Sequence, residues 1–337
     1  MKMRKMATTL NRMIAATSAM LAGFVLAAPP VVAAEKMALT LNWTIGADHA
    51  PIYFAQARGD YAAAGVDLTI EIGKGSAYAA QRVGVGASQI GIVDMPTAMQ
   101  AKGEGADLVG VMVIYATSPY TIYWKKSSGI KTIKDLSGHS IGTPAADAAR
   151  LMWPLIAKTA GLDPASVRFV NVAPDAKFAA LQSGTIDATT NFFNLHYVAE
   201  RTFKDDLGFL RLADIGFNPY GNSFFVNGAY LKEHSDAVRR FTQVTQKAYA
   251  SCLADPAPCL QAVANAASQD PNDLALSWKL TAELIRSPQP VPMLGYFLPE
   301  RIASDYQTVK SAFTLKDFDA RTIYTNDFLD KGVTAAN

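Results

Sequence analysis

The sequence predicts an α/β protein of two lobes, joined by hinge crossovers and completed by a helical C-terminal part. Two observations support this prediction. Apolar strand-like runs alternate with helical stretches from residue 37 to residue 226, which is typical of a mostly parallel sheet with helices on both faces. The alternation runs twice, with a break at 116–120, and becomes purely helical after Leu231. A chain of 337 residues is long enough for two such lobes.

The elements of the first lobe follow from local patterns. The apolar run 37–41 predicts a strand, and residues 50–64 predict a helix. Gly46 interrupts the regular structure between them. Residues 66–72 alternate apolar and polar side chains, as a half-buried strand does. A glycine loop at 73–76 follows. The remaining elements predicted here are a helix at 77–85, a strand at 89–93, a helix at 96–102 and a strand at 107–115.

The second lobe repeats the alternation between crossovers predicted at 116–120 and 228–231. Its strands are predicted at 121–124, 139–142, 168–172, 186–190, 209–213 and 223–226, and its helices at 132–138, 145–160, 175–183 and 195–203. Further helices at 234–254, 259–269, 270–285 and 299–312 are expected to pack back on the first lobe. The predicted domains are a signal peptide (1–34), a first part of lobe I (35–118), lobe II (119–230) and a mostly helical completion of lobe I (231–337).

The N-terminus has the pattern of a secretory signal peptide. Basic residues at 2, 4, 5 and 12 precede an apolar stretch at 13–28, and Val32-Ala33-Ala34 fits a cleavage site. We expect cleavage near Ala34 and a soluble protein in the periplasm. The alternative is an anchor that stays attached, but the apolar run is short for a membrane span and two prolines follow it.

Charge and cysteine content limit the possible functions. The chain has 31 Lys and Arg against 29 Asp and Glu, so we expect no nucleic-acid partner. Cys252 and Cys259 lie seven apart around a Pro-Ala-Pro turn, and an oxidising compartment favours a local disulfide between them. The alternative is two buried free thiols. We expect no metal site, because this stretch has too few ligands and the four histidines are scattered.

Candidate ligand-binding residues lie in the loops after the predicted strands, where open α/β sheets bind ligands. Trp43 offers a ring for stacking, and Asp48 and His49 offer a carboxylate and an imidazole. The alternatives are an N-cap for Asp48 and a hydrogen bond within the loop for His49. Ser76 and Thr143 precede predicted helices, where they either bind an anion or carbonyl or simply cap the helix. The other candidates are Asp94, Tyr115, Thr117, Asn191, Phe193, Tyr220 and Asn222.

A longer run around Trp43 resembles a known family. Trp43, His49-Ala-Pro-Ile-Tyr53, Gly59-Asp-Tyr61 and Gly65-Val-Asp-Leu68 together resemble the NMT1/THI5-like periplasmic substrate-binding proteins of ABC importers, which have the type II periplasmic-binding-protein fold. Stretches at 133–142 and 179–188 fit the same family. The resemblance implies a monomer that captures a small molecule in an interlobe cleft, closes by hinge motion and delivers the molecule to an ABC permease.

The resemblance also suggests a ligand class. In the pyrimidine binders of this family the loop Trp stacks on the ring, and acidic and amide side chains hold its amino group. Trp43 and His49 carry over by position and Asn194 supplies the amide, but Leu195 stands where those binders have Glu. The expected ligand is aromatic or heterocyclic, similar to a thiamine-precursor pyrimidine. The alternatives are a small sulfonate, carboxylate or nitrate, or a sensory protein that docks a receptor.

Enzymatic motifs are missing from the sequence. It contains no Gly-x-Ser-x-Gly, no His-Glu-x-x-His and no phosphate loop. We therefore expect no catalytic residues, no cofactor and no enzymatic activity.

Overall fold

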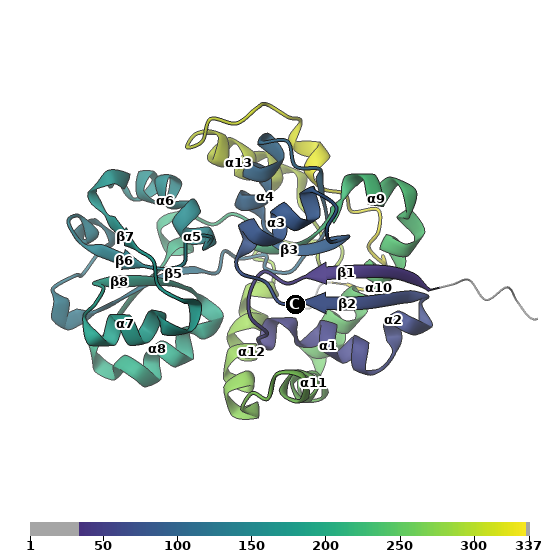
Figure 1. The fold of residues 1–337 in the computed structure, drawn as a ribbon, viewed down its shortest axis with the longest axis horizontal. Coiled ribbons are helices and arrows are strands. Elements are labelled where there is room, and N and C mark those ends of the chain that lie inside the picture. Colours follow the sequence, from purple (N-terminus) through teal and green to yellow (C-terminus); the bar gives the residue numbers. More distant parts are fainter. Residues whose placement is uncertain (1–33, 335–337) are drawn as a thin grey trace, which may run out of the picture. The chain divides into compact units, whose positions relative to one another are not determined.

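A computed structural model describes residues 34–334 of the chain. It has the mixed α/β architecture that the sequence predicts, built on two five-stranded sheets (Figure 1). The predicted signal peptide, residues 1–34, lies outside the described residues except for Ala34. Within the described range, no helix has the length and apolar character needed to cross a membrane.

The first sheet has the strand order β2-β1-β3-β10-β4. β1 (Glu35–Thr40) is parallel to β2 (Val66–Glu71) and β3 (Ile90–Asp94), whereas β10 (Asn222–Asn227) is antiparallel to β3 and to β4 (Leu108–Val113). Every residue of β3 and β10 is buried, and the centres of both strands are apolar. We call this sheet and the helices that pack on it lobe I.

Helices cover both faces of the first sheet (Figure 1). On one face lie α1 (Ala50–Ala57), α10 (Ser235–Ala254) and α11 (Ala257–Ala267), which pack on one another. The opposite face is covered by α3 (Ser76–Gly84), α4 (Met95–Gly103) and α13 (Pro299–Lys310). The C-terminal helices thus complete lobe I, because their apolar side chains share its core. The other helices of this part are α2 (Asp60–Ala63), α9 (Gly228–Glu233) and α12 (Pro271–Ile285).

The second sheet has the order β7-β6-β8-β5-β9 and, with its helices, forms lobe II. β5 (Tyr120–Lys125) is antiparallel to β8 (Ala188–Phe192) and β9 (Leu207–Arg211), and β6 (Ser140–Gly142) is parallel to β7 (Arg168–Val170) and β8. The helices of lobe II are α5 (Ala148–Leu151), α6 (Trp153–Ala160), α7 (Lys177–Ser183) and α8 (His196–Phe203).

The chain returns from lobe II to lobe I earlier than the sequence predicts. The predicted return at 228–231 is wrong, because Asn222–Asn227, which the range 119–230 assigned to lobe II, pairs with β3 and β4 of lobe I. The crossing therefore lies between β9 and β10, at 212–221. A short apolar run predicts a buried strand but does not identify the sheet that receives it.

Two local features shape the helices α1, α2, α10 and α11. Gly59, with φ of 75°, divides the predicted helix 50–64 into α1 and α2, because this left-handed conformation interrupts a helix and favours glycine. Cys252 of α10 and Cys259 of α11 form the predicted disulfide, which links these two helices. Both cysteines are fully buried against the core of lobe I.

Candidate functional site

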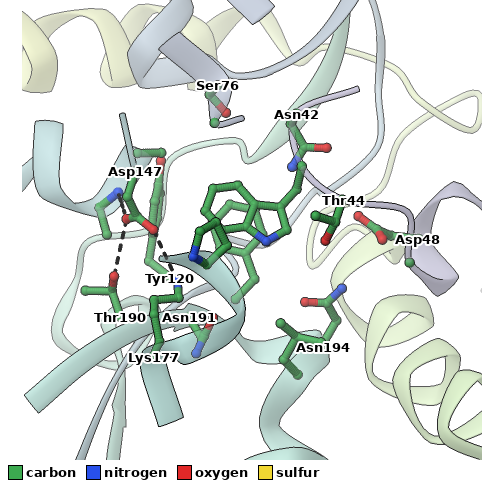
Figure 2. Close-up of a pocket in the computed structure, with 18 of the residues that line it drawn as sticks. Asn42, Thr44, Asp48, Ser76, Tyr120, Asp147, Lys177, Thr190, Asn191 and Asn194 are labelled. Atoms are coloured by element: carbon green, nitrogen blue, oxygen red, sulfur yellow. Dashed lines mark hydrogen bonds and ion pairs between the residues drawn. The ribbon is translucent and has the colours of Figure 1, made fainter. Parts of the chain in front are cut away.

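A cavity of about 240 Å³ lies between the loops of the two lobes (Figure 2). Lobe I contributes the loop after β1 and the start of α3. Lobe II contributes the start of β5, the end of β8 and the starts of α5 and α7, and α12 contributes one serine. The lining residues are Asn42, Trp43, Thr44, Ile45, Gly46, Asp48, Gly75, Ser76, Tyr120, Asp147, Ala148, Ala149, Pro174, Asp175, Lys177, Thr190, Asn191, Phe192, Asn194, Leu195 and Ser277.

The loop after β1 is held in shape by His49. The backbone N–H of Gly46 donates to His49 Nδ1 at 3.1 Å, so the proton of the neutral ring lies on Nε2 and is donated to Asn42 Oδ1, also at 3.1 Å. This bond leaves the amide nitrogen of Asn42 available on the cavity wall (Figure 2). His49 itself is buried and does not line the cavity, so it positions Asn42 instead of offering its own ring to a ligand.

Asp48 lies on the cavity wall in the same loop. It sits inside a short 3₁₀ turn, Ala47–His49, whose N-cap is Gly46, so the alternative of an N-cap role for Asp48 is not what the structure shows. Its carboxylate oxygen lies 3.6 Å from His49 Nδ1. The Asp48 side chain is mostly buried and faces the cavity, where it can accept hydrogen bonds from a ligand.

We expect acidification to destabilise the wild-type protein more than a His49→Gln variant. Burial lowers the pKa of His49 below its usual 6.5, and Asp48 opposes this shift. As the pH falls below 6.5, the imidazole of His49 takes up a proton in the unfolded chain before it does so in the folded protein. The free energy of unfolding therefore decreases as the pH falls from 6.5 towards the lower pKa of the folded state. The loss is at most about 1.4 kcal/mol per pH unit. Urea unfolding between about pH 7.5 and pH 5 measures the slope for both proteins.

The matched control for this prediction is His139→Gln, which alters a partly exposed histidine of lobe II. This control removes an imidazole that is not buried, so its slope should stay steeper than that of His49→Gln. The pKa of His196 is also lowered by burial, but its contribution is common to all three proteins and cancels in the comparison. A His49→Gln variant with the wild-type slope would show that His49 is not the titrating group.

On the lobe II wall, Asp147 caps α5 and collects four donors. Its Oδ1 accepts from the backbone N–H groups of Ala149 and Arg150 and from the Thr190 hydroxyl, and its Oδ2 accepts from Lys177 Nζ at 3.3 Å. The helix predicted from residue 145 therefore starts at Ala148, with Asp147 rather than Thr143 at its entrance. The dashed lines of Figure 2 mark the bonds of Asp147 to Thr190 and Lys177.

Thr143 lies outside the cavity lining and is fully buried. Its Oγ1 lies 3.1 Å from Thr190 Oγ1, and its backbone N–H donates to the carbonyl of Val170. The expectation that Thr143 presents a helix N-terminus to a ligand is therefore wrong. Pro144 looked like a first helical residue, but the carboxylate of Asp147 is a stronger capping group and moves the helix start by several residues.

Lys177 is a buried residue of the cavity lining that the sequence analysis missed. It opens α7, is 2% exposed and lines the cavity, and its ammonium lies 5.1 Å from the centre of the Trp43 ring. Trp43 belongs to lobe I, so this contact joins the two lobes. Burial lowers the pKa of Lys177, and Asp147 opposes the shift. Sequence pattern gave no signal for Lys177, because a lysine at the start of a helix is usually solvated.

Asn191 and Asn194 line the cavity at the end of β8. The amide nitrogen of Asn194 donates to the Tyr115 hydroxyl at 3.4 Å, and its Oδ1 is a buried atom without a hydrogen-bond partner in the described part of the chain. A buried acceptor left open in this way is costly unless a ligand or water satisfies it. Phe193, which was expected here, packs under Arg211 instead, and its neighbour Phe192 lines the cavity.

Behind Ser76 lies a buried hydrogen-bond relay between the lobes. Ser76 lines the cavity, and its Oγ accepts from the backbone N–H of Asp94 at 3.2 Å. The Tyr120 hydroxyl of lobe II donates to Asp94 Oδ1 at 2.6 Å. Asp94 is fully buried, does not line the cavity, and has its pKa raised by burial. Tyr120 was not predicted as a site residue, but it lines the cavity and is the lobe II member of this chain of hydrogen bonds.

The remaining predicted residues lie away from the cavity. Thr117 donates its backbone N–H to Leu284, Tyr220 packs under Arg301, and Asn222 pairs with Asp94 on the neighbouring strand. The structure thus brings five predicted residues to the cavity, which are Trp43, Asp48, Ser76, Asn191 and Asn194. It places eight outside the lining, which are His49, Asp94, Tyr115, Thr117, Thr143, Phe193, Tyr220 and Asn222.

Comparison with known proteins shows what this fold is similar to. A sequence model of the family described as NMT1/THI5 like matches residues 46–258. The alkanesulfonate-binding protein SsuA of Xanthomonas axonopodis pv. citri, solved with MOPS bound, is 17% identical, with a TM-score of 0.64 over 88% of this chain and 99% of that chain. The periplasmic aliphatic sulphonate binding protein SsuA of Escherichia coli is 18% identical, with a TM-score of 0.60 over 82% and 86%. The predicted two-lobe periplasmic-binding-protein fold is confirmed.

Curated relatives correct one expectation. A 4-amino-5-hydroxymethyl-2-methylpyrimidine phosphate synthase of Legionella pneumophila is 25% identical over 70% of this chain and 75% of its own length. A formylaminopyrimidine-binding protein of Halalkalibacterium halodurans is 22% identical over 66% and 68%. The expectation that the chain is not an enzyme is contradicted, because relatives named as synthases match it. Motif absence could not exclude catalysis, since one fold hosts both binding and catalysis.

Proposed function

The chain belongs to the NMT1/THI5-like family, and from this premise we propose that it is the solute-binding component of an ABC importer that captures a flat, nitrogen-containing heterocycle between its lobes. Delivery then requires an ABC permease as partner. The periplasm is the proposed location, supported by the signal-peptide pattern at 1–34 and by structural neighbours named as periplasmic. The arrangement of two lobes with a cavity between them also supports a role in capture.

The composition of both cavity walls is the observation that supports capture by closure. Lobe I supplies Trp43 and Asp48, and lobe II supplies Asn191 and Asn194. A ligand that contacts both walls stabilises the closed arrangement relative to the open one and so shifts the population toward closure. The two lobes are joined by two crossings, at 114–119 and 212–221, which are the segments that can act as a hinge.

The polar atoms of the cavity favour a ligand that donates hydrogen bonds. The open Oδ1 of Asn194 and the carboxylate of Asp48 are acceptors that suit ring amino or ring N–H groups. Trp43 supplies an aromatic face, which adds about 0.5–1.5 kcal/mol when a ring stacks on it. A relative named as a formylaminopyrimidine-binding protein supports the same ligand class. Leu195 does line the cavity, so the Glu of the pyrimidine binders is replaced by an apolar contact.

A thermal-shift screen of the mature protein tests this proposal. The probes are 4-amino-5-hydroxymethyl-2-methylpyrimidine, riboflavin, benzoate and the sulfonate MOPS. Ligand at about 100 times its Kd stabilises the folded state by about 2.7 kcal/mol, so the heterocycles should raise the Tm. Stabilisation by MOPS alone would contradict the heterocycle class and support a sulfonate binder instead. Mass spectrometry of the same samples, repeated with time, detects any chemical conversion of the probe.

A further inference from the structure

Lys177 has hydrogen-bonding capacity that the protein leaves unused. An ammonium has three N–H donors, and within the described residues Lys177 Nζ finds one hydrogen-bond acceptor, Asp147 Oδ2 at 3.3 Å. The side chain is 2% exposed, so bulk water does not satisfy the other donors. Its ammonium also lies over the face of Trp43, 5.1 Å from the centre of the ring. Burying an ammonium in this state is costly unless further acceptors approach it.

Asp147 does not need the charge of Lys177 to remain in place. Three other donors converge on its Oδ1, at 3.0 Å from Ala149 N, 3.4 Å from Arg150 N and 3.2 Å from Thr190 Oγ1. These hydrogen bonds hold the carboxylate in position without a contribution from Lys177. The positive charge of Lys177 is therefore available to a second anionic group that enters the cavity from the opposite side.

The opposite side of the cavity has acceptors instead. Figure 2 shows Lys177 and Asp147 on one side and Asp48 and Asn194 on the other. Asp48 is mostly buried, and Asn194 Oδ1 has no hydrogen-bond partner in the described part of the chain. The third carboxylate of the cavity lining is that of Asp175, an exposed residue that follows Pro174. The cavity is thus polarised, with a donor cation at one end and acceptors at the other.

We propose that Lys177 forms a subsite for an oxyanion and that the ligand is a heteroaromatic ring with a carboxylate at one edge and an amino group at the opposite edge. This inference rests on the proposed function and adds the charge of the ligand to it. The ring lies at Trp43, the carboxylate accepts from Lys177 Nζ, and the amino group donates to Asp48 and Asn194. Lys177 is then the residue that distinguishes a charged ligand from a neutral one of the same shape.

Two probes of equal shape and different charge test the subsite. They are 2-aminopyrimidine-5-carboxylate, whose amino and carboxylate groups lie on opposite edges of the ring, and its 5-carboxamide, titrated calorimetrically into wild type and Lys177→Met. Wild type should bind the carboxylate about 10- to 100-fold more tightly than the carboxamide, because a hydrogen bond to a charged group is the stronger kind. Lys177→Met should lose this preference and keep its affinity for the carboxamide. Lys177→Arg, which keeps the charge, should retain part of the preference.

The control variant is Lys134→Met, which removes an exposed lysine of the same lobe and should behave as wild type. If Lys177→Met does not fold by circular dichroism, the double variant Asp147→Asn with Lys177→Met removes both charges and retains a capping side chain at 147. Equal binding of both probes by wild type, or a preference that survives in Lys177→Met, would overturn the subsite and leave the proposed function standing. Binding of neither probe would overturn the pyrimidine-type ligand and this inference together.

Discussion

Replacing Gly75 by alanine should weaken ligand binding by about 100-fold or more, although each lobe still folds. Gly75 lies before α3 in lobe I and has φ of 120°. A Cβ at this position would lie 2.3 Å from the carbonyl oxygen of Ala146, which belongs to the loop before α5 in lobe II. Because the obstacle is backbone, the two lobes must move apart to make room. Ligand binds tightly only when the two lobes can approach each other. The apparent affinity therefore falls in proportion to the fraction of molecules that can still reach this arrangement.

The control for Gly75→Ala is Gly105→Ala, which separates the clash from backbone strain. Gly105 has φ of 107°, but a Cβ there has nothing within 4 Å. Both variants should lose a similar amount of stability, and only Gly75→Ala should lose affinity in calorimetry. Small-angle scattering in the presence of ligand should also show a larger radius of gyration for Gly75→Ala than for wild type. Unchanged affinity in Gly75→Ala would mean that ligand binding does not require this approach of the lobes.

Trp43→Ala should lower the affinity for an aromatic ligand by about 10- to 100-fold, from lost stacking and lost apolar burial. Trp43 is only partly buried, so the Tm without ligand should change little. Trp43→Phe keeps a flat ring and should recover most of the affinity. Calorimetric titration of all three proteins with the best heterocycle of the thermal-shift screen measures the effect. An Ala variant that binds like wild type would show that Trp43 is not the stacking surface.

The fold was predictable because strand and helix patterns are local. Alternating runs such as 66–72, and the apolar stretches 89–93 and 107–115, each predict a strand that the structure contains. The placement of β10 was not predictable in this way, because its partners β3 and β4 lie more than 100 residues earlier in the chain. Local pattern predicts that a strand exists, whereas sheet membership depends on contacts made across the whole domain.

The site was predictable in part, and the failures have physical reasons. Trp43 and Asp48 were found because they follow the first strand, in the loop position where α/β folds bind ligands. Lys177 was missed because its contact with Trp43 joins two lobes and two residues that are far apart in sequence. His49 was assigned to the ligand, whereas its two ring nitrogens are both used within the loop. Residue type alone does not distinguish a group that contacts a ligand from one that supports it.

The order of strands in lobe I has a consequence for how the chain folds during synthesis. β4 pairs with β10 and forms an isolated bridge between Gly110 and Tyr324, so its backbone partners are all made after lobe II. The first sheet therefore stays open, with an unpaired edge at β3, until about 100 further residues have been added. Contacts between such distant segments form slowly. Delayed completion of lobe I keeps the chain unfolded longer, which would suit the export across a membrane that the proposed function requires.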